Sequence, residues 1–151
     1  MNETMNDPDT RSFLPEDRAN GADQARAADL VFDHGLPGFA GARRFSLSSW
    51  GADDGPFSLM KCLDDTAEFL VATPDAFFPD YHPEIDDEVA GWLGITAPDD
   101  GLVLVIVTVP EQAKNATANL LGPLVINKTT RRSIQAVLSE DFSAREPLFR
   151  R

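Results

Sequence analysis

The strongest constraint on the fold is an unbroken apolar run, LVLVIVTV at residues 102–109, which lies between Gly101 and Pro110. Valine and isoleucine favour strands, and a proline cannot donate a hydrogen bond to a neighbouring strand. The run is far shorter than the ~20 residues that a membrane-spanning helix needs. Because both faces of such a strand are apolar, we expect it to be central in a sheet and covered on both sides.

Shorter segments with strand character lie on both sides of this run, separated by turns rich in glycine, proline and aspartate. They cover residues 30–32, 43–50, 57–63, 68–73, 116–121, 124–127 and 134–138. We expect the last two of these strands to pair as a hairpin. So many short strands at close spacing predict a mainly β fold, a small antiparallel β-barrel or sandwich-like single domain.

One short helix is expected within this β pattern. Its apolar face is formed by residues that recur at helical spacing, namely Ile85, Val89, Trp92 and Leu93. Asp86 stands where an N-terminal cap would help, and Gly94 stands where the helix should end.

The chain of 151 residues is long enough for one domain and short for two. Residues 1–28 are acidic and contain few large apolar side chains, so we expect a poorly ordered N-terminal tail. We expect the β domain to span residues 29–149.

Charge excludes several classes of function. The sequence contains 25 acidic and 13 basic residues, for a net charge of −12. Direct nucleic-acid binding requires clustered lysine and arginine, so a basic partner protein is the better electrostatic match. No signal peptide or membrane span is apparent, and the single cysteine excludes an intrachain disulfide. These features favour a protein of the cytoplasm without a membrane partner.

The sequence gives little support for an enzymatic function. A metal-assisted hydrolase could use His34, Asp80 and His82 if the fold brought them together, although single histidines in turns are more often surface residues. Adjacent aspartate pairs occur at 53–54, 64–65, 86–87 and 99–100, and aspartate is favoured in turns and at helix starts for backbone bonding. No nucleophile motif and no phosphate-binding loop is present.

Two segments are unusual in a way that suggests contact with a protein. FFPDY at 77–81 gathers three aromatic side chains around a proline, which either fill one end of the barrel or anchor a partner. Asn119 stands inside an expected strand, where asparagine is uncommon. It either braces the backbone or marks a sheet edge that a partner could extend.

Five blocks in order resemble the flagellar assembly factor FliW family. They are FDHGLPGF at 32–39, FFPDY at 77–81, VIVTVP at 105–110, TANLLGPLVIN at 117–127 and QAVL at 135–138. The resemblance spans about residues 30–148.

The resemblance implies a small β-barrel-like fold with no enzymatic activity, no cofactor and no metal. It implies two protein partners: flagellin, and the RNA-binding translational regulator CsrA, which the protein would capture once flagellin has been exported. The alternative within the family is a chaperone that binds flagellin alone. From these blocks we predict partner contacts at Phe78, Asp80, Tyr81, Asn119, Leu120 and Asn127.

The sequence departs from the family pattern in two places. The first strand of the family has only a faint counterpart at residues 11–14. Arg131, Arg132 and Ser133 stand where the family often has a glycine in the last hairpin, so the geometry of that turn is in question.

Overall fold

The computed structural model describes residues 29–52 and 54–149; the expected acidic tail, residues 1–28, lies outside this part. The strands are β2 (Leu30–Phe32), β3 (Arg44–Ser49), β4 (Phe57–Cys62), β5 (Glu68–Ala72), β6 (Gly101–Thr108), β7 (Thr117–Ala118), β8 (Leu124–Asn127), β9 (Arg132–Gln135) and β10 (Glu146–Pro147). The single α-helix of the described residues, α1, spans Asp87–Leu93. Three 3₁₀ turns span Pro74–Ala76, Pro98–Asp100 and Ala113–Asn115.

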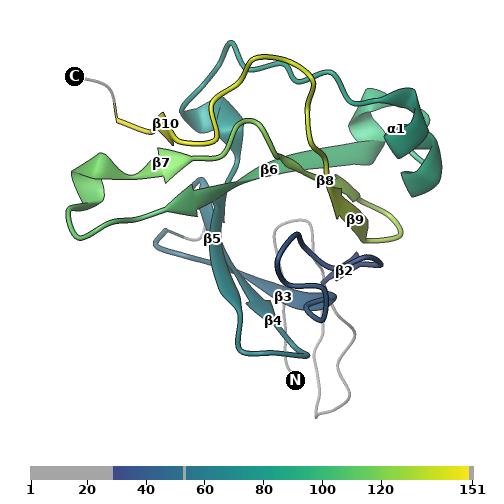
Figure 1. Cartoon of the computed structure of the whole chain (residues 1–151), viewed down its shortest axis with the longest axis horizontal. Helices are drawn as coiled ribbons and strands as arrows, with labels where there is room; N and C mark the ends of the chain where they lie inside the picture. Colours follow the sequence, from purple (N-terminus) through teal and green to yellow (C-terminus); the bar gives the residue numbers. More distant parts are fainter. Residues whose placement is uncertain (1–28, 53, 150–151) are drawn as a thin grey trace.

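Seven of the strands close into a barrel. The hydrogen-bonded order is β6-β5-β4-β3-β2-β9-β8, and β8 pairs again with β6 to complete the ring. β7 and β10 extend outward from β6 as a small flap (Figure 1). The mainly β fold with one short helix is therefore confirmed.

The expectation of an antiparallel barrel is wrong in one respect, because β2 and β9 run parallel. All other neighbouring pairs in the ring are antiparallel. Strand direction cannot alternate all the way around a ring with an odd number of strands, so a closed ring of seven needs at least one parallel pair. We call the β2–β9 pair the barrel seam.

β6 is central, as its apolar run predicts, and its two faces serve two different cores. Leu104 points into the barrel interior with Phe45 and Met60. Val105 and Val107 point to the opposite face, into a second hydrophobic cluster. This alternation follows from the two-residue period of a strand, and it explains why a strand buried on both faces lacks polar residues.

Helix α1 has the boundaries that its end residues predict. The side chain of Asp86 accepts a hydrogen bond from the backbone N–H of Glu88 and caps the N-terminus. Gly94 ends the helix in the left-handed conformation, with φ of 75°. Leu93 is buried in a third cluster with Val125 of β8, which places α1 against the outside of the barrel.

Two strands near the C-terminus differ from their expected lengths. The strand expected over residues 116–121 is reduced to β7, because Asn119 accepts hydrogen bonds from the backbone N–H groups of Leu121 and Gly122 and turns the chain. The expected hairpin of residues 124–127 with 134–138 is present, but its second strand, β9, begins two residues earlier and ends at Gln135.

Candidate protein-binding site

Four aromatic side chains form a connected surface, which we call the aromatic ledge: Trp50, Phe57, Phe77 and Phe149. Ring centroids are 5.7 Å apart for Trp50 and Phe57, 5.4 Å for Phe57 and Phe77, and 6.0 Å for Phe77 and Phe149. Trp50 is 50% exposed and Phe149 is 46% exposed. A row of partly exposed aromatic rings is typical of a surface that anchors a protein partner.

The ledge lies at the edge of the second hydrophobic cluster, which contains three of the predicted contact residues. Phe78, Tyr81 and Leu120 are all buried in this cluster, and Phe57 and Phe77 pack against it. Phe77 and Phe78 are adjacent rings with a centroid separation of 6.4 Å. The FFPDY segment therefore places Phe78 and Tyr81 in a core outside the barrel interior, not at the barrel end, and Phe77 in the ledge. Its role as an anchor for a partner stays a prediction.

Tyr81 is fixed at the centre of this cluster. Its hydroxyl donates a 2.6 Å hydrogen bond to the carbonyl oxygen of Leu120. Burial, together with the nearby charge of Glu140, raises the pKa of Tyr81 to about 12. The tyrosine is thus held protonated as a structural donor that links two predicted contact residues.

Asn119 and Asn127 use their side chains to shape the backbone. Asn119 accepts from the backbone of residues 121 and 122, which confirms the bracing role considered for it. The Asn127 amide donates a 2.7 Å bond to the carbonyl of Leu93, while its oxygen accepts from the N–H groups of Thr129 and Thr130. Asn127 therefore joins the C-terminus of α1 to the β8–β9 hairpin.

Asp80 is the exposed member of the six predicted residues, and Asn119 is half-buried. The other four, Phe78, Tyr81, Leu120 and Asn127, are at most 6% exposed. Direct contact with a partner stays a prediction for all six. This placement indicates that Asp80 is accessible to a partner and that the buried residues support the surface around it.

A segment at the end of the chain, residues 139–149, crosses the second cluster; we call it the C-terminal strap. In Figure 1 it arches above β6 before reaching β10. The Phe142 ring packs against Tyr81 with a centroid separation of 4.9 Å, and Leu148 is buried in the cluster. Phe149 at its end belongs to the aromatic ledge, so the strap and the ledge form one continuous surface.

His34, Asp80 and His82 do not form the metal site considered from the sequence. Among the described residues, which include all three, there is no group of three or more His, Cys, Asp or Glu side chains able to hold a metal ion. The His34 ring instead stacks on Trp92 with a centroid separation of 5.2 Å. Arg132 covers the Trp92 ring at 4.3 Å and forms an ion pair with Asp33 across the barrel seam.

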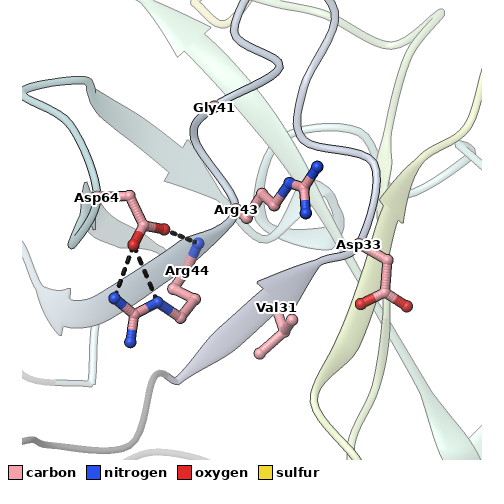
Figure 2. A pocket seen from close by; sticks show the side chains of 6 residues that line it. All are labelled: Val31, Asp33, Gly41, Arg43, Arg44 and Asp64. Atoms are coloured by element: carbon pink, nitrogen blue, oxygen red, sulfur yellow. Dashed lines mark hydrogen bonds and ion pairs between the residues drawn. The ribbon is translucent and has the colours of Figure 1, made fainter.

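A pocket of about 470 Å³ lies beside the seam and is lined by Val31, Asp33, Gly41, Arg43, Arg44 and Asp64 (Figure 2). Its carboxylates are already engaged by arginines. Asp64 accepts bonds from the side chain and backbone of Arg44, which lowers the pKa of the Asp64 carboxyl. Asp33 is paired with Arg132. The Asp33–Arg132 ion pair crosses the seam, and the Arg44–Asp64 ion pair joins β3 to the turn after β4.

Comparison with known proteins decides the family. The family model described as FliW protein matches residues 17–148. The chain belongs to the FliW family. It is 40% identical over 113 residues to the flagellar assembly factor FliW of Treponema pallidum, covering 74% of each chain. It is 38% identical over 125 residues to that of Symbiobacterium thermophilum, covering 80% of this chain and 91% of the relative.

A solved structure supports the same assignment. The crystal structure of a flagellar assembly factor FliW superimposes with a TM-score of 0.75 at 31% identity, covering 81% of this chain and 86% of the other. The FliW blocks noted in the sequence coincide with β2 and its turn, the second cluster, β6, and the β7–β8 region. None of the helices in residues 29–52 and 54–149 is long and apolar enough to cross a membrane.

Three of the four ledge residues of this FliW-family chain carry no signal in the sequence that points to a binding surface. Trp50 and Phe57 flank one turn between two expected strands, and Phe149 lies more than 90 positions further along the chain, at the end of the expected β domain. A sequence signal existed only for Phe77, through its place in FFPDY. The ledge is a product of the tertiary structure.

Proposed function

We propose that this protein is a non-enzymatic flagellar assembly factor of the cytoplasm that binds flagellin and also binds and antagonises CsrA. In this scheme, flagellin occupies the protein until it is exported, and the freed protein then captures CsrA and relieves repression of flagellin synthesis. The observation that carries the proposal is membership of the FliW family across residues 17–148, whose relatives are named flagellar assembly factors.

The aromatic ledge supports a protein-binding role. Its half-exposed rings offer apolar area that a folded partner can bury, and aromatic side chains dominate the energetics of many interfaces. We propose that Asp80 contacts a partner directly. Phe78, Tyr81, Asn119, Leu120 and Asn127 would hold the surrounding surface in its binding shape.

The charge of the chain supports a basic partner. An RNA-binding regulator such as CsrA must offer positive charge to phosphates. A chain with a net charge of −12 would be steered toward that charge, which raises the association rate at low salt.

Binding and competition experiments with purified components test the proposal. The chain would be mixed with flagellin and with CsrA from its own source, separately and together, and the complexes separated by size-exclusion chromatography. We expect a complex with each partner alone and mutual displacement when both are present. Simultaneous binding of both partners would rule out the switch, and binding of flagellin alone would leave the alternative, a flagellin chaperone without CsrA regulation.

A further inference from the structure

The C-terminal strap packs against β7, Leu120 and Tyr81, and we call the surface that it covers the strap groove. Two apolar side chains of the strap fill it: Phe142 packs on the Tyr81 ring, and Leu148 is 5% exposed within the second cluster. The backbone adds hydrogen bonds, from the Leu120 N–H to the Ser143 carbonyl and from the Leu148 N–H to the Ala116 carbonyl. The groove therefore binds an extended segment through two apolar anchors and a sheet edge.

The attachment of the strap is slight compared with that of the barrel strands. β10 pairs with β7 through only two residue pairs, and β7 is joined to β6 through only two. Most of the residues of the strap are exposed. Segments with few buried contacts and short pairings open at lower free energy than a core sheet does.

The surface beyond the strap favours a longer occupant. The strap ends on the ledge at Phe149, which contacts Phe77, but the ledge continues through Phe57 to Trp50, and the strap leaves Trp50 half exposed. A segment that followed the groove and then the ledge would bury this remaining aromatic area. Such a segment would gain contacts that the strap itself does not make.

We propose that this groove is a docking site for an extended segment of a partner polypeptide, which replaces the strap together with Phe149 and continues along the remaining ledge residues, Phe77, Phe57 and Trp50. The strap shows the required chemistry: an aromatic residue and a leucine placed like Phe142 and Leu148, with free backbone groups between them to pair with the edge of β7. This proposal depends on the proposed function in one respect: it takes the partner to be a protein. Displacement of the strap would expose Tyr81 and Leu120, two of the predicted contact residues.

The first test uses the full chain and a fluorescent peptide that copies residues 139–149, followed by anisotropy. Leu148→Ala weakens the chain's own strap, so we expect the variant to bind the peptide at least tenfold more tightly than the unmodified chain does. A peptide with alanine in place of both its phenylalanine at 142 and its leucine at 148 is the matched control and should not bind. Equal binding of the peptide by both chains would overturn the proposal.

A disulfide lock provides the second arm. Thr117 and Pro147 face each other in the β7–β10 register, next to the hydrogen-bonded pair of Ala116 and Leu148. Hydrogen-bonded and non-hydrogen-bonded pairs alternate along an antiparallel ladder, so Thr117 and Pro147 form a non-hydrogen-bonded pair. The Cα atoms of such a pair are close enough for a disulfide. In a Cys62→Ser background, we expect Thr117→Cys with Pro147→Cys to bind the peptide at least tenfold more weakly when oxidised than when reduced. Equal binding in both redox states would contradict strap replacement.

Hydrogen exchange tests whether the strap opens in the unmodified chain, so this test needs no variant. The Leu120 N–H bonds to the strap, whereas the adjacent Asn119 N–H bonds to the carbonyl of Ile106 in β6. We expect the Leu120 amide to exchange at least tenfold faster than the Asn119 amide. Equal protection of the two would show that the strap does not open separately from the barrel.

The outcomes separate this proposal from the proposed function. The peptide copies this chain, so its binding does not require flagellin or CsrA. If those partners bind while the peptide fails, only the groove assignment is wrong. If the Leu148→Ala variant forms a dimer and does not bind the peptide, the groove is occupied by a second copy of the chain. That outcome overturns the assignment to a partner segment.

Discussion

The Tyr81 hydroxyl donates a 2.6 Å hydrogen bond to the carbonyl oxygen of Leu120, a residue 39 positions further along the chain. Both side chains are about 5% exposed. Two residues predicted as partner contacts are therefore bonded to each other inside the protein. We expect any effect of these two residues on partner binding to act through the shape of the surface above them, where the C-terminal strap lies.

Alkaline pH should destabilise the protein through Tyr81. The pKa of this tyrosine is raised from 10.0 to about 12, first by burial and then by Glu140, so the folded state favours the protonated form. This contribution to the free energy of unfolding is complete below pH ~10 and is lost as the pH rises toward 12. Tyr81 is the sole tyrosine of the chain, so tyrosinate absorbance reports it alone.

Tyr81→Phe is the matched variant for this experiment. Urea unfolding at increasing pH should show that the free energy of unfolding of the variant falls less between pH ~10 and 12 than that of the parent chain. At neutral pH we expect it to be less stable by about 1 kcal/mol, because the Leu120 carbonyl loses its donor. A tyrosinate titration near the ordinary pKa in the folded chain would contradict the burial of the hydroxyl.

Asn127→Ala should destabilise the protein by about 2 kcal/mol, since it removes a buried donor to Leu93 and the acceptor for Thr129 and Thr130. Thermal and urea unfolding measure the change. The neighbouring Lys128→Ala alters an exposed side chain and serves as a control that should stay within about 0.5 kcal/mol of the parent. Equal effects of the two substitutions would show that the side-chain bonds of Asn127 contribute nothing.

Arg131 has a left-handed backbone, with φ of 70°, in the turn between β8 and β9. Arg131→Gly and Arg131→Ala both remove the same side chain, so their difference isolates the backbone. We expect the glycine variant to be more stable than the alanine variant by about 1 kcal/mol, because a Cβ is disfavoured in this conformation. Identical urea midpoints for the two variants would show that the turn is not held in the left-handed region.

Trp50→Ala should weaken partner binding at least tenfold and leave the free energy of unfolding nearly unchanged, since the ring is half exposed. Isothermal titration with each partner measures the affinity. Leu63→Ala, which also removes an exposed apolar side chain, lies outside the ledge and should bind normally. An equal loss of affinity in both variants would count against the ledge as the specific contact surface.

The local elements could be predicted because their signals are local. The apolar run at 102–109 predicts β6, and the spacing of Val89, Trp92 and Leu93 with Asp86 and Gly94 predicts α1 and both of its ends. Ile85, which the same spacing places on the apolar face, precedes the helix. The turn at Asn119 shortened an expected strand because its side chain competes for backbone donors. Strand propensity alone does not reveal that competition.

The sequence by itself determined that the chain would form many short strands around one central apolar strand, because strand periodicity and turn chemistry act between near neighbours. It also carried the resemblance to the family. Only the tertiary structure decided that β2 and β9 meet in parallel and that Trp50, Phe57, Phe77 and Phe149 gather on one surface. Closure of a seven-stranded ring forces a parallel pair whichever segments provide it. The ledge forms because Trp50 and Phe57 flank the β3–β4 turn and Phe77 follows β5, the neighbour of β4. The pairing of β10 with β7 then brings Phe149 to the same surface.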